Sequence, residues 1–439
     1  MKYSDEQKAD FLDAVKDGSF CIFPWIHMYT EPDGRTFPCC TVEQDTINEN
    51  TKDKTLEEIF NSDDWNKLRL DMLNGIKNPI CRRCHGVEES GSPSYRTFAN
   101  GDFGQYVDVI DETNDDGSVD KFELKYIDVR FSNQCNFACA SCGPVFSTKW
   151  VQMAKENAEA NGRTFNSQHK YNKISNYSKV DIIEQLEPHL EDSHQIYFAG
   201  GEPLIMDDHY KLLELLEEKN VTDTKLRYNT NISNLYYKKK PIYEYWKNFN
   251  NIELGMSIDA VGERANLIRH GTDWNVLEEN IKTLLPYENI RLNYDSTISI
   301  LNIDHITTMY DYILEHNLVK EDTWFTTNIA YTPTPFSITS LPPEVKNDIT
   351  KRLSRWAEQI KTRDMHNNVS RYAIDDISSK MYNLINFMNE RDTFDPKYFA
   401  IEISYKLWYT DKWKEIPHFK YIYDTYVSKE HKQRWLNEE

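Results

Sequence analysis

Cys135, Cys139 and Cys142 lie within eight residues, in the stretch CNFACASC. Thiolates are soft ligands that select zinc, copper or iron–sulfur clusters. A four-iron cluster takes one thiolate per iron, so three cysteines would leave one iron open to an outside ligand. A structural zinc site needs four closed ligands, and no further cysteine follows in the chain. The spacing therefore favours an iron–sulfur cluster with an open iron over zinc or buried free thiols.

Five more cysteines precede this motif, at positions Cys21, Cys39, Cys40, Cys81 and Cys84. Cys81 and Cys84 have the knuckle spacing of a tetrathiolate site, whose other half must come from Cys21 and one of the adjacent pair Cys39 and Cys40. Zinc and an iron–sulfur cluster are both chemically sound here, and spacing alone favours zinc. Adjacent residues tend to project in different directions, so one of Cys39 and Cys40 is expected to be left over.

A repeated strand-then-helix order surrounds the three-cysteine motif. Helical stretches such as residues 209–220 and 304–317 alternate with six apolar runs typical of strands, namely LKYIDVRF, QIYFAGG, KLRYNTN, IELGMSID, RLNYDSTISI and TWFTTNIAY. This alternation predicts right-handed crossovers and a parallel sheet. Six units, rather than eight, predict an α/β fold with a partial (β/α)6 TIM-like barrel. The motif follows the first strand, at the carboxyl end where such folds place their chemistry.

The rest of the chain divides around this barrel. We expect an N-terminal cysteine-rich module over residues 1–107, opened by a short amphipathic helix in residues 1–16. An acidic stretch over residues 108–122 lacks apolar periodicity, which predicts a solvated linker or a long excursion at a domain boundary. The barrel then covers residues 123–333, with a polar loop expected at 156–178. A mainly helical C-terminal region, residues 334–439, opens a helix after two prolines.

The CxxxCxxC spacing of Cys135, Cys139 and Cys142 after the first strand resembles the signature of the radical S-adenosylmethionine (SAM) superfamily. The resemblance implies that the open iron of a four-iron cluster chelates the amino and carboxylate groups of SAM. It also implies that an electron from an external donor, such as flavodoxin or ferredoxin, cleaves SAM to methionine and a 5'-deoxyadenosyl radical. Ser141 departs from the pattern, because the residue before the last cysteine is often aromatic in this family.

A segment after the second strand fits the same resemblance. Gly200, Gly201, Glu202 and Pro203 look like the family's GGEP segment, which contacts the methionine ammonium of SAM through backbone oxygens and the glutamate. Taken alone, these residues would also suit a simple Gly-Pro turn. Their spacing after the cysteine motif favours the cofactor-binding interpretation.

Polar residues after the third and fourth strands are further candidates for contacts with SAM. Asn229, Asn231, Ser257 and Asp259 have short side chains that suit hydrogen bonds to ribose hydroxyls and to the methionine carboxylate. A turn or capping role is the alternative for each asparagine. Arg269 offers a planar fork that suits a carboxylate, and a surface arginine is the alternative there.

The N-terminal cysteines, with an Asp-Gly hairpin, the run LEEIF and a CxxC, resemble the twitch or SPASM auxiliary-cluster module of radical SAM enzymes. This resemblance implies an iron–sulfur cluster instead of zinc. A two-cluster SPASM module uses about seven cysteines, so five imply one auxiliary cluster and two 4Fe–4S clusters in the whole chain. Such modules commonly follow the barrel, whereas this one precedes it. The thiol left over, Cys39 or Cys40, is either buried beside the cluster or a catalytic hydrogen-atom donor of the kind that epimerases of the superfamily require.

Composition limits the partners of the protein. The formal net charge of -20 would repel phosphate, which argues against nucleic acid or an anionic membrane as the main partner. No signal pattern and no membrane-spanning apolar run is present, so we expect a cytoplasmic protein. We expect a peptide or protein substrate that is crosslinked, epimerised or dehydrogenated at an unactivated carbon. The alternatives are a sugar or aminocyclitol substrate and, in a different class, a noncatalytic zinc- or cluster-containing binding protein.

Overall fold

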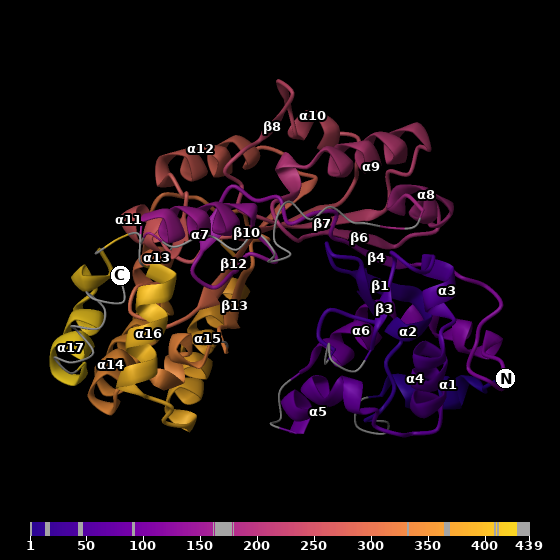
Figure 1. The fold of residues 1–439 in the computed structure, drawn as a ribbon, viewed down its shortest axis with the longest axis horizontal. Coiled ribbons are helices and arrows are strands. Elements are labelled where there is room, and N and C mark those ends of the chain that lie inside the picture. The colour runs from indigo at the N-terminus through magenta and orange to yellow at the C-terminus, as the bar shows by residue number, and fades with distance from the viewer. Residues whose placement is uncertain are drawn as a thin grey trace.

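A computed structural model describes residues 2–13, 18–42, 47–89, 93–160, 162, 178, 180–331, 333–363, 369–407, 410 and 412–427. One long sheet runs through the molecule, with strand order β13-β12-β10-β7-β6-β4-β1-β2-β3. Figure 1 shows the N-terminal module at one end of this sheet and the C-terminal helices at the other.

All six predicted barrel strands form, and they lie side by side in chain order as a parallel sheet. They are β4 (Tyr126–Val129), β6 (Gln195–Phe198), β7 (Lys225–Thr230), β10 (Ile252–Ser257), β12 (Ile290–Ile298) and β13 (Phe325–Ile329). Between them run α7 (Thr148–Ala160), α8 (Ile182–Leu186), α9 (Asp207–Glu218), α10 (Tyr243–Trp246), α11 (Gly262–Ile268), α12 (Trp274–Leu284) and α13 (Ile306–Glu315). The short 3-10 helices η4 (Glu187–His189) and η5 (Pro203–Ile205) and the hairpin β8 (Tyr236–Tyr237) and β9 (Lys240–Pro241) complete this part. The expected partial six-stranded barrel is confirmed.

Side chains alternate between the two faces of the barrel sheet. In β7, Leu226 and Tyr228 are fully buried, while Arg227 and Asn229 are only partly buried. The Tyr228 hydroxyl lies 3.0 Å from the His209 ring nitrogen of α9, so the apolar face packs under the helices. Burying one such large apolar side chain stabilises the fold by about 1.5–3 kcal/mol. The opposite, inner face is therefore the one that carries polar side chains.

The N-terminal module extends the barrel sheet. Its strand β1 (His27–Thr30) pairs in parallel with β4, and β2 (Arg35–Phe37) and β3 (Glu49–Asn50) continue the sheet in antiparallel fashion. Its helices are α1 (Asp5–Leu12), α2 (Phe23–Ile26), α3 (Leu56–Phe60), α4 (Asp63–Leu73), α5 (Arg82–Glu89) and α6 (Tyr95–Phe103), with the 3-10 helices η2 (Pro79–Cys81) and η3 (Gly104–Glu112). The sequence did not predict this pairing, because it joins strands about a hundred residues apart and the periodicity of a strand does not say which strand it joins. The module thus attaches at the first strand of the barrel.

The acidic stretch at residues 108–122 packs against the module in part. Thr113 pairs with Val119 across a short antiparallel bridge, and both residues are buried. Val119 also donates its backbone N–H to the Asn61 side chain at 3.0 Å. The stretch is therefore not solvated throughout, and the domain limits themselves stay a prediction.

The C-terminal region is helical, as predicted. It contains η6 (Thr334–Phe336), η7 (Ile338–Ser340), α14 (Pro343–Ile360), α15 (Arg371–Glu390), α16 (Pro396–Leu407), η8 (Lys412–Glu415) and α17 (Pro417–Tyr426). The Lys380 ammonium of α15 donates to the Phe325 carbonyl oxygen, which ties this region to β13 at the edge of the sheet. The first residues of the loop predicted at 156–178 belong instead to α7, which ends at Ala160. Of the remaining residues of this loop, only 162 and 178 are among those described. Of the helices described, none combines the length and apolar character that crossing a membrane requires.

Candidate active site

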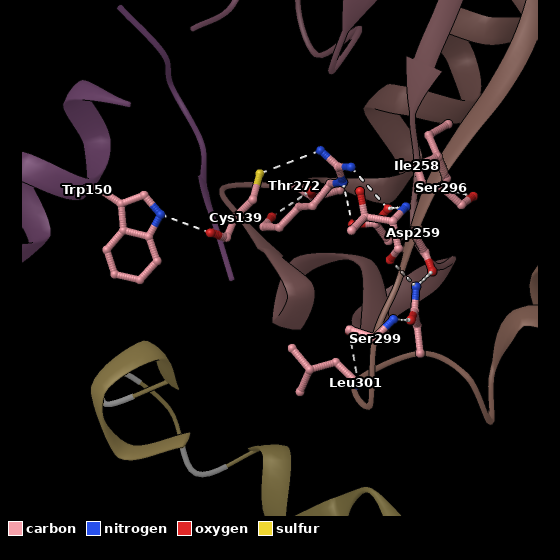
Figure 2. Close-up of polar contacts among 11 residues, drawn as sticks. Cys139, Trp150, Ile258, Asp259, Thr272, Ser296, Ser299 and Leu301 are labelled. Atoms are coloured by element: carbon pink, nitrogen blue, oxygen red, sulfur yellow. Dashed lines mark hydrogen bonds and ion pairs between the residues drawn. The ribbon is translucent and has the colours of Figure 1, made fainter. Parts of the chain in front are cut away.

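The loop after β4 brings Cys135, Cys139 and Cys142 to one cavity of about 400 Å³. The start of α7 holds this loop in place. The Cys135 N–H donates to Thr148 Oγ1 at 3.2 Å, and the Trp150 indole donates to the Cys139 carbonyl oxygen at 2.9 Å (Figure 2). Burial raises the pKa of the Cys135 and Cys139 thiols, so binding a metal there would displace their protons. A cavity of this volume is in the range of small-molecule sites.

Arg269 lies beside the cluster loop because of a small second sheet. Strand β5 (Ala138–Cys139) pairs in antiparallel fashion with β11 (Arg269–His270), which sets Arg269 opposite Cys139. The guanidinium donates to Cys139 Sγ at 3.7 Å and to the Asp259 carboxylate at 2.8 and 3.0 Å, as the dashed lines of Figure 2 show. Only 13% of the Arg269 side chain is exposed and it lines the cavity, so the surface alternative is wrong.

Asp259 lies behind Arg269 and not at the cavity. Its residue is 2% exposed, and its Oδ1 also accepts the Thr297 backbone N–H at 2.7 Å. The Asn302 amide donates to the Asp259 carbonyl oxygen at 3.0 Å. These contacts fix the carboxylate against the guanidinium, so Asp259 orients Arg269, and a direct contact of Asp259 with SAM stays a prediction.

The GGEP segment packs directly on the chain that enters the cluster loop. Gly200 and Gly201 have left-handed φ values of 76° and 54°. A Cβ on Gly201 would overlap the Gln134 carbonyl oxygen and lie 2.9 Å from that of Ser132. The Glu202 N–H donates to the Gln134 carbonyl oxygen at 2.8 Å. Only glycine permits this close approach, which sets the glutamate beside the thiols.

Glu202 is buried at the cavity with a full set of donors. Its carboxylate accepts hydrogen bonds from Thr230 Oγ1 at 2.5 Å, from the Asn231 N–H at 2.7 Å and from the Leu204 N–H at 3.1 Å. Burial raises the pKa of Glu202 to about 7, although these hydrogen bonds lower it. Pro203 is buried at the start of η5 and does not contribute to the cavity lining.

Asn229, Asn231 and Ser257 all line the cavity. The Asn231 amide donates to Asn136 Oδ1 in the cluster loop at 3.0 Å, and its own Oδ1 accepts the Ser233 N–H at 2.9 Å. Asn231 therefore combines the turn role with a place at the site. Asn229 instead belongs to a chain of side-chain hydrogen bonds across the inner face of the sheet.

Four of the five N-terminal thiols gather in one place. The Cys21 thiol lies near Cys81 and Cys84, and burial together with these thiols raises its pKa. Burial raises the pKa of Cys81 too, with contributions from Cys39 and Cys84. The Thr41 hydroxyl lies 3.3 Å from the Cys39 sulfur and 3.7 Å from that of Cys84. The set Cys21, Cys39, Cys81 and Cys84 is thus brought together.

Cys40 faces the barrel. Burial and the Asp128 carboxylate raise its pKa to about 11, while Arg130 and a hydrogen bond from Tyr95 lower it. Arg130 itself lines the cavity that holds the three thiols of the other motif. The structure therefore distinguishes the adjacent cysteines, which the sequence left open.

Within the residues that the structure describes, no group of three or more His, Cys, Asp or Glu side chains is arranged to hold a single metal ion. A four-iron cluster requires a wider arrangement of thiols than a single metal ion does, because each of its thiolates binds a different iron. Three thiols around one cavity, with room beside them for a ligand, fit such a cluster and SAM. Four thiols in the module fit a second cluster.

Several residues at the cavity escaped sequence reasoning, namely Arg130, Tyr197, Thr230 and Thr297. Arg130 pairs with Asp128 at 3.2 Å, and its guanidinium lies 4.5 Å from the centre of the Tyr29 ring. Alternation could have found Arg130, Tyr197 and Thr297, since polar residues at every second position of a predicted strand share one face. Thr230 shares the parity of the buried Tyr228 in β7, so alternation would not have found it.

Comparisons with solved structures give weak likenesses. The chain is similar to anSMEcpe with bound AdoMet and a Cp18Cys peptide, at 17% identity and a TM-score of 0.37, over 56% of this chain and 63% of that one. It is also similar to SuiB of Streptococcus suis bound to S-adenosylmethionine, at 13% identity and a TM-score of 0.37, over 70% of this chain and 65% of that one. The chain thus spans less than two thirds of each of these proteins. No curated protein sequence matches it.

Two family models match the chain where the thiols lie. Residues 21–85 match SPASM, an iron–sulfur cluster-binding domain, and this range holds all five N-terminal cysteines. Residues 129–307 match the radical SAM superfamily, and this range holds the three-cysteine motif and the other cavity residues described above. A radical SAM domain binds SAM and a four-iron cluster, and a SPASM domain binds auxiliary iron–sulfur clusters, which confirms the expected cofactors. The chain therefore carries a SPASM domain over residues 21–85, ahead of a radical SAM domain over residues 129–307.

Proposed function

We propose that this protein is a radical SAM enzyme that abstracts hydrogen from an unactivated carbon of a peptide or protein. The observation that supports the proposal is the single cavity that gathers Cys135, Cys139 and Cys142 with Glu202 and Arg269. Cluster ligands, an acid and a cation at one cavity are what binding an amino acid cofactor at an open iron requires. When bound, the cluster and SAM supply a 5'-deoxyadenosyl radical after one electron arrives from an external donor such as flavodoxin or ferredoxin.

We assign the residues as follows. The three thiols hold the first cluster, and Glu202 accepts hydrogen bonds from the methionine nitrogen of SAM. Arg269, oriented by Asp259, faces the methionine carboxylate. Asn231 and Ser257, at the ends of their strands, donate to the carboxylate or the ribose hydroxyls.

We assign the auxiliary cluster to Cys21, Cys39, Cys81 and Cys84, and leave Cys40 free of it. Replacement of Cys39 by alanine is expected to remove about half of the iron after anaerobic reconstitution, because each 4Fe–4S cluster holds half of the total. Replacement of Cys40 by alanine serves as the matched control and is expected to retain all of it. Equal loss of iron in both variants would contradict the assignment.

We propose Cys40 as the hydrogen-atom donor if the reaction is redox-neutral, as an epimerisation is. The thiol gives a hydrogen atom to the substrate carbon radical and becomes a thiyl radical. That radical returns to the thiol by taking one electron from the external donor and one proton. In deuterated water the product should then carry one deuterium, and the Cys40→Ala variant should still cleave SAM but form no epimer. Full epimer formation by Cys40→Ala would refute this role.

The decisive experiment for the function is anaerobic reconstitution followed by chemical reduction in the presence of SAM. We expect a brown protein, about eight irons per chain and release of 5'-deoxyadenosine. A triple variant with alanine at Cys135, Cys139 and Cys142 should keep the iron of the auxiliary cluster but release no 5'-deoxyadenosine. Stoichiometric zinc without iron, and no cleavage by the wild-type protein, would support the noncatalytic alternative instead.

We propose a peptide or protein substrate, and a sugar or aminocyclitol is the alternative. The neighbouring genes discriminate between the two: a small precursor-peptide gene beside this one favours peptide modification, whereas sugar-nucleotide genes favour carbohydrate chemistry. The mass of the product in ordinary water then separates epimerisation from crosslinking and dehydrogenation, because epimerisation leaves the mass unchanged whereas the other two each remove two hydrogens.

A further inference from the structure

The inner face of the barrel sheet is polar where an ordinary closed barrel is filled with branched apolar side chains. One row across it, in register from β1 to β10, consists of Tyr29, Asp128, Tyr197, Arg227 and Glu253. Several of these side chains are only partly buried. Such a face does not serve as a hydrophobic core, and it adjoins the cavity at Arg130 and Tyr197.

Three carboxylates on this face differ in their partners. Asp128 pairs with Arg130 at 3.2 Å, and Glu253 pairs with Lys225 at 2.5 Å and with Arg227 at 3.4 Å. Asp295, on β12, forms no ion pair with any cation in the described part of the chain. Two of the three carboxylates therefore form ion pairs within the fold, whereas Asp295 has no cation in direct contact and only the more distant charge of Arg227 favours its ionised form.

Neutral groups hold Asp295 in place. The Asn229 amide donates to Asp295 Oδ2 at 2.9 Å, and the Tyr197 hydroxyl donates to Asn229 Oδ1 at 2.6 Å. The Thr326 hydroxyl also contributes a hydrogen bond. This chain of hydrogen bonds crosses from β6 through β7 to β12 and fixes the direction of the amide. The carboxylate is thus oriented without being neutralised.

Gly255 makes room for this arrangement. It lies on β10, between the strands of Asn229 and Asp295, and is paired in register with Asn229. A Cβ at Gly255 would overlap Asp295 Oδ2, so the carboxylate lies flat across the glycine. A larger residue would clash with this carboxylate and its Cβ would lie 2.8 Å from the Tyr228 carbonyl oxygen, so glycine permits Asp295 to stay in contact with Asn229.

The cavity is directly beside Asp295. Asn229, which holds it, lines the cavity, as do Ser257, paired in register with Asp295, and Thr297, two residues further along β12. Burial raises the pKa of Asp295, so its ionised form is less favourable here than in a solvent-exposed aspartate. A charge without a partner in such a place is most readily explained by a partner that arrives with a ligand.

We propose that Asp295 binds a cationic nitrogen of the substrate, an ammonium group, next to the SAM cavity. The inference rests on the proposed function, because only an enzyme has a substrate. Its test measures binding and does not require turnover. The ammonium would belong either to a lysine-type side chain of a peptide or to an amino sugar. Its nitrogen would replace the missing ion-pair partner, with Tyr197 and Asn229 keeping the carboxylate in position.

The test compares charged probes with neutral counterparts by isothermal titration calorimetry on the reconstituted protein with SAM. One pair is acetyl-Gly-Lys-Gly-amide and its norleucine analogue, and the other is glucosamine and glucose. We expect one charged probe to bind at least about tenfold more tightly than its neutral counterpart. The pair that shows this preference identifies the source of the ammonium. Equal binding within both pairs would overturn the proposal.

Variants locate the preference. Asp295→Asn should abolish it, while Asp192→Asn, the same change at an exposed position, should retain it. Retention of the preference by Asp295→Asn would overturn the proposal. Thermal unfolding provides a second criterion, because removing an uncompensated charge should leave the melting temperature of Asp295→Asn unchanged or higher, whereas Asp128→Asn should lower it by unpairing Arg130. A loss as large as that of Asp128→Asn would show a structural carboxylate and refute the assignment. A protein that binds the cation selectively but does not cleave SAM would refute the proposed function and leave this inference standing.

Discussion

The ionisation of Glu202 predicts how the affinity for SAM depends on pH. The residue is 2% exposed, and burial raises the pKa of its carboxyl to about 7. At pH 6 the carboxyl is therefore mainly protonated, and at pH 8 mainly ionised. The ionised form is the better acceptor for the methionine nitrogen of SAM, so the affinity should rise with pH across this window.

The size of the effect follows from linkage. If SAM binds only the ionised form, the apparent dissociation constant is multiplied by one plus the ratio of protonated to ionised carboxyl. With a pKa of about 7 that factor is about 11 at pH 6 and about 1.1 at pH 8, a gain in affinity of about tenfold. An unperturbed glutamate, with a pKa of about 4.3, would change affinity by only a few per cent over the same range.

The assay is anaerobic calorimetry of SAM binding at pH 6, 7 and 8, for wild-type protein and for Glu202→Gln. The amino group of SAM titrates as well, but it does so in both proteins, so the difference between the two pH profiles isolates Glu202. We expect the variant to bind more weakly at pH 8 and to lack the tenfold component. Equal iron content in both proteins is the control for an intact cluster. Parallel pH profiles would refute the role assigned to Glu202.

Two further predictions concern the supports of the site. Gly201→Ala should lower the free energy of unfolding by more than about 2 kcal/mol and reduce the iron content, because its φ of 54° is left-handed and its Cβ would overlap the Gln134 carbonyl oxygen. Gly143→Ala, where an added Cβ meets nothing within 4 Å, is the control, and equal urea midpoints of the two variants would contradict the argument. Asp259→Ala should lower the free energy of unfolding by about 3–5 kcal/mol in urea denaturation, since it leaves the Arg269 guanidinium buried without its carboxylate. A loss below about 1 kcal/mol would mean that the pair contributes little to positioning Arg269.

The six barrel strands could be predicted because each is a short apolar run. Such a run can be recognised from its own residues, without knowledge of the rest of the chain. The same holds for the helix that follows Pro342, where the proline at the first turn sets the start. The pairing of β1 with β4 could not be predicted in this way, and neither could the place of Arg269 opposite Cys139. Both are contacts between segments far apart in the chain, and they depend on how whole elements pack.

Sequence by itself predicted the cofactor chemistry, because the types and close spacing of Cys135, Cys139 and Cys142 favour a cluster with an open iron and resemble the radical SAM signature. Tertiary structure decided which thiol stands apart and which charge lacks a partner. Cys39 and Cys40 are neighbours in sequence, yet they face different parts of the fold, since successive side chains point in different directions and each meets whatever the fold brings there. Asp295 is similar in type to Asp128, and only the packing of strands shows that Arg130 forms an ion pair with Asp128 while the neutral Asn229 amide holds Asp295.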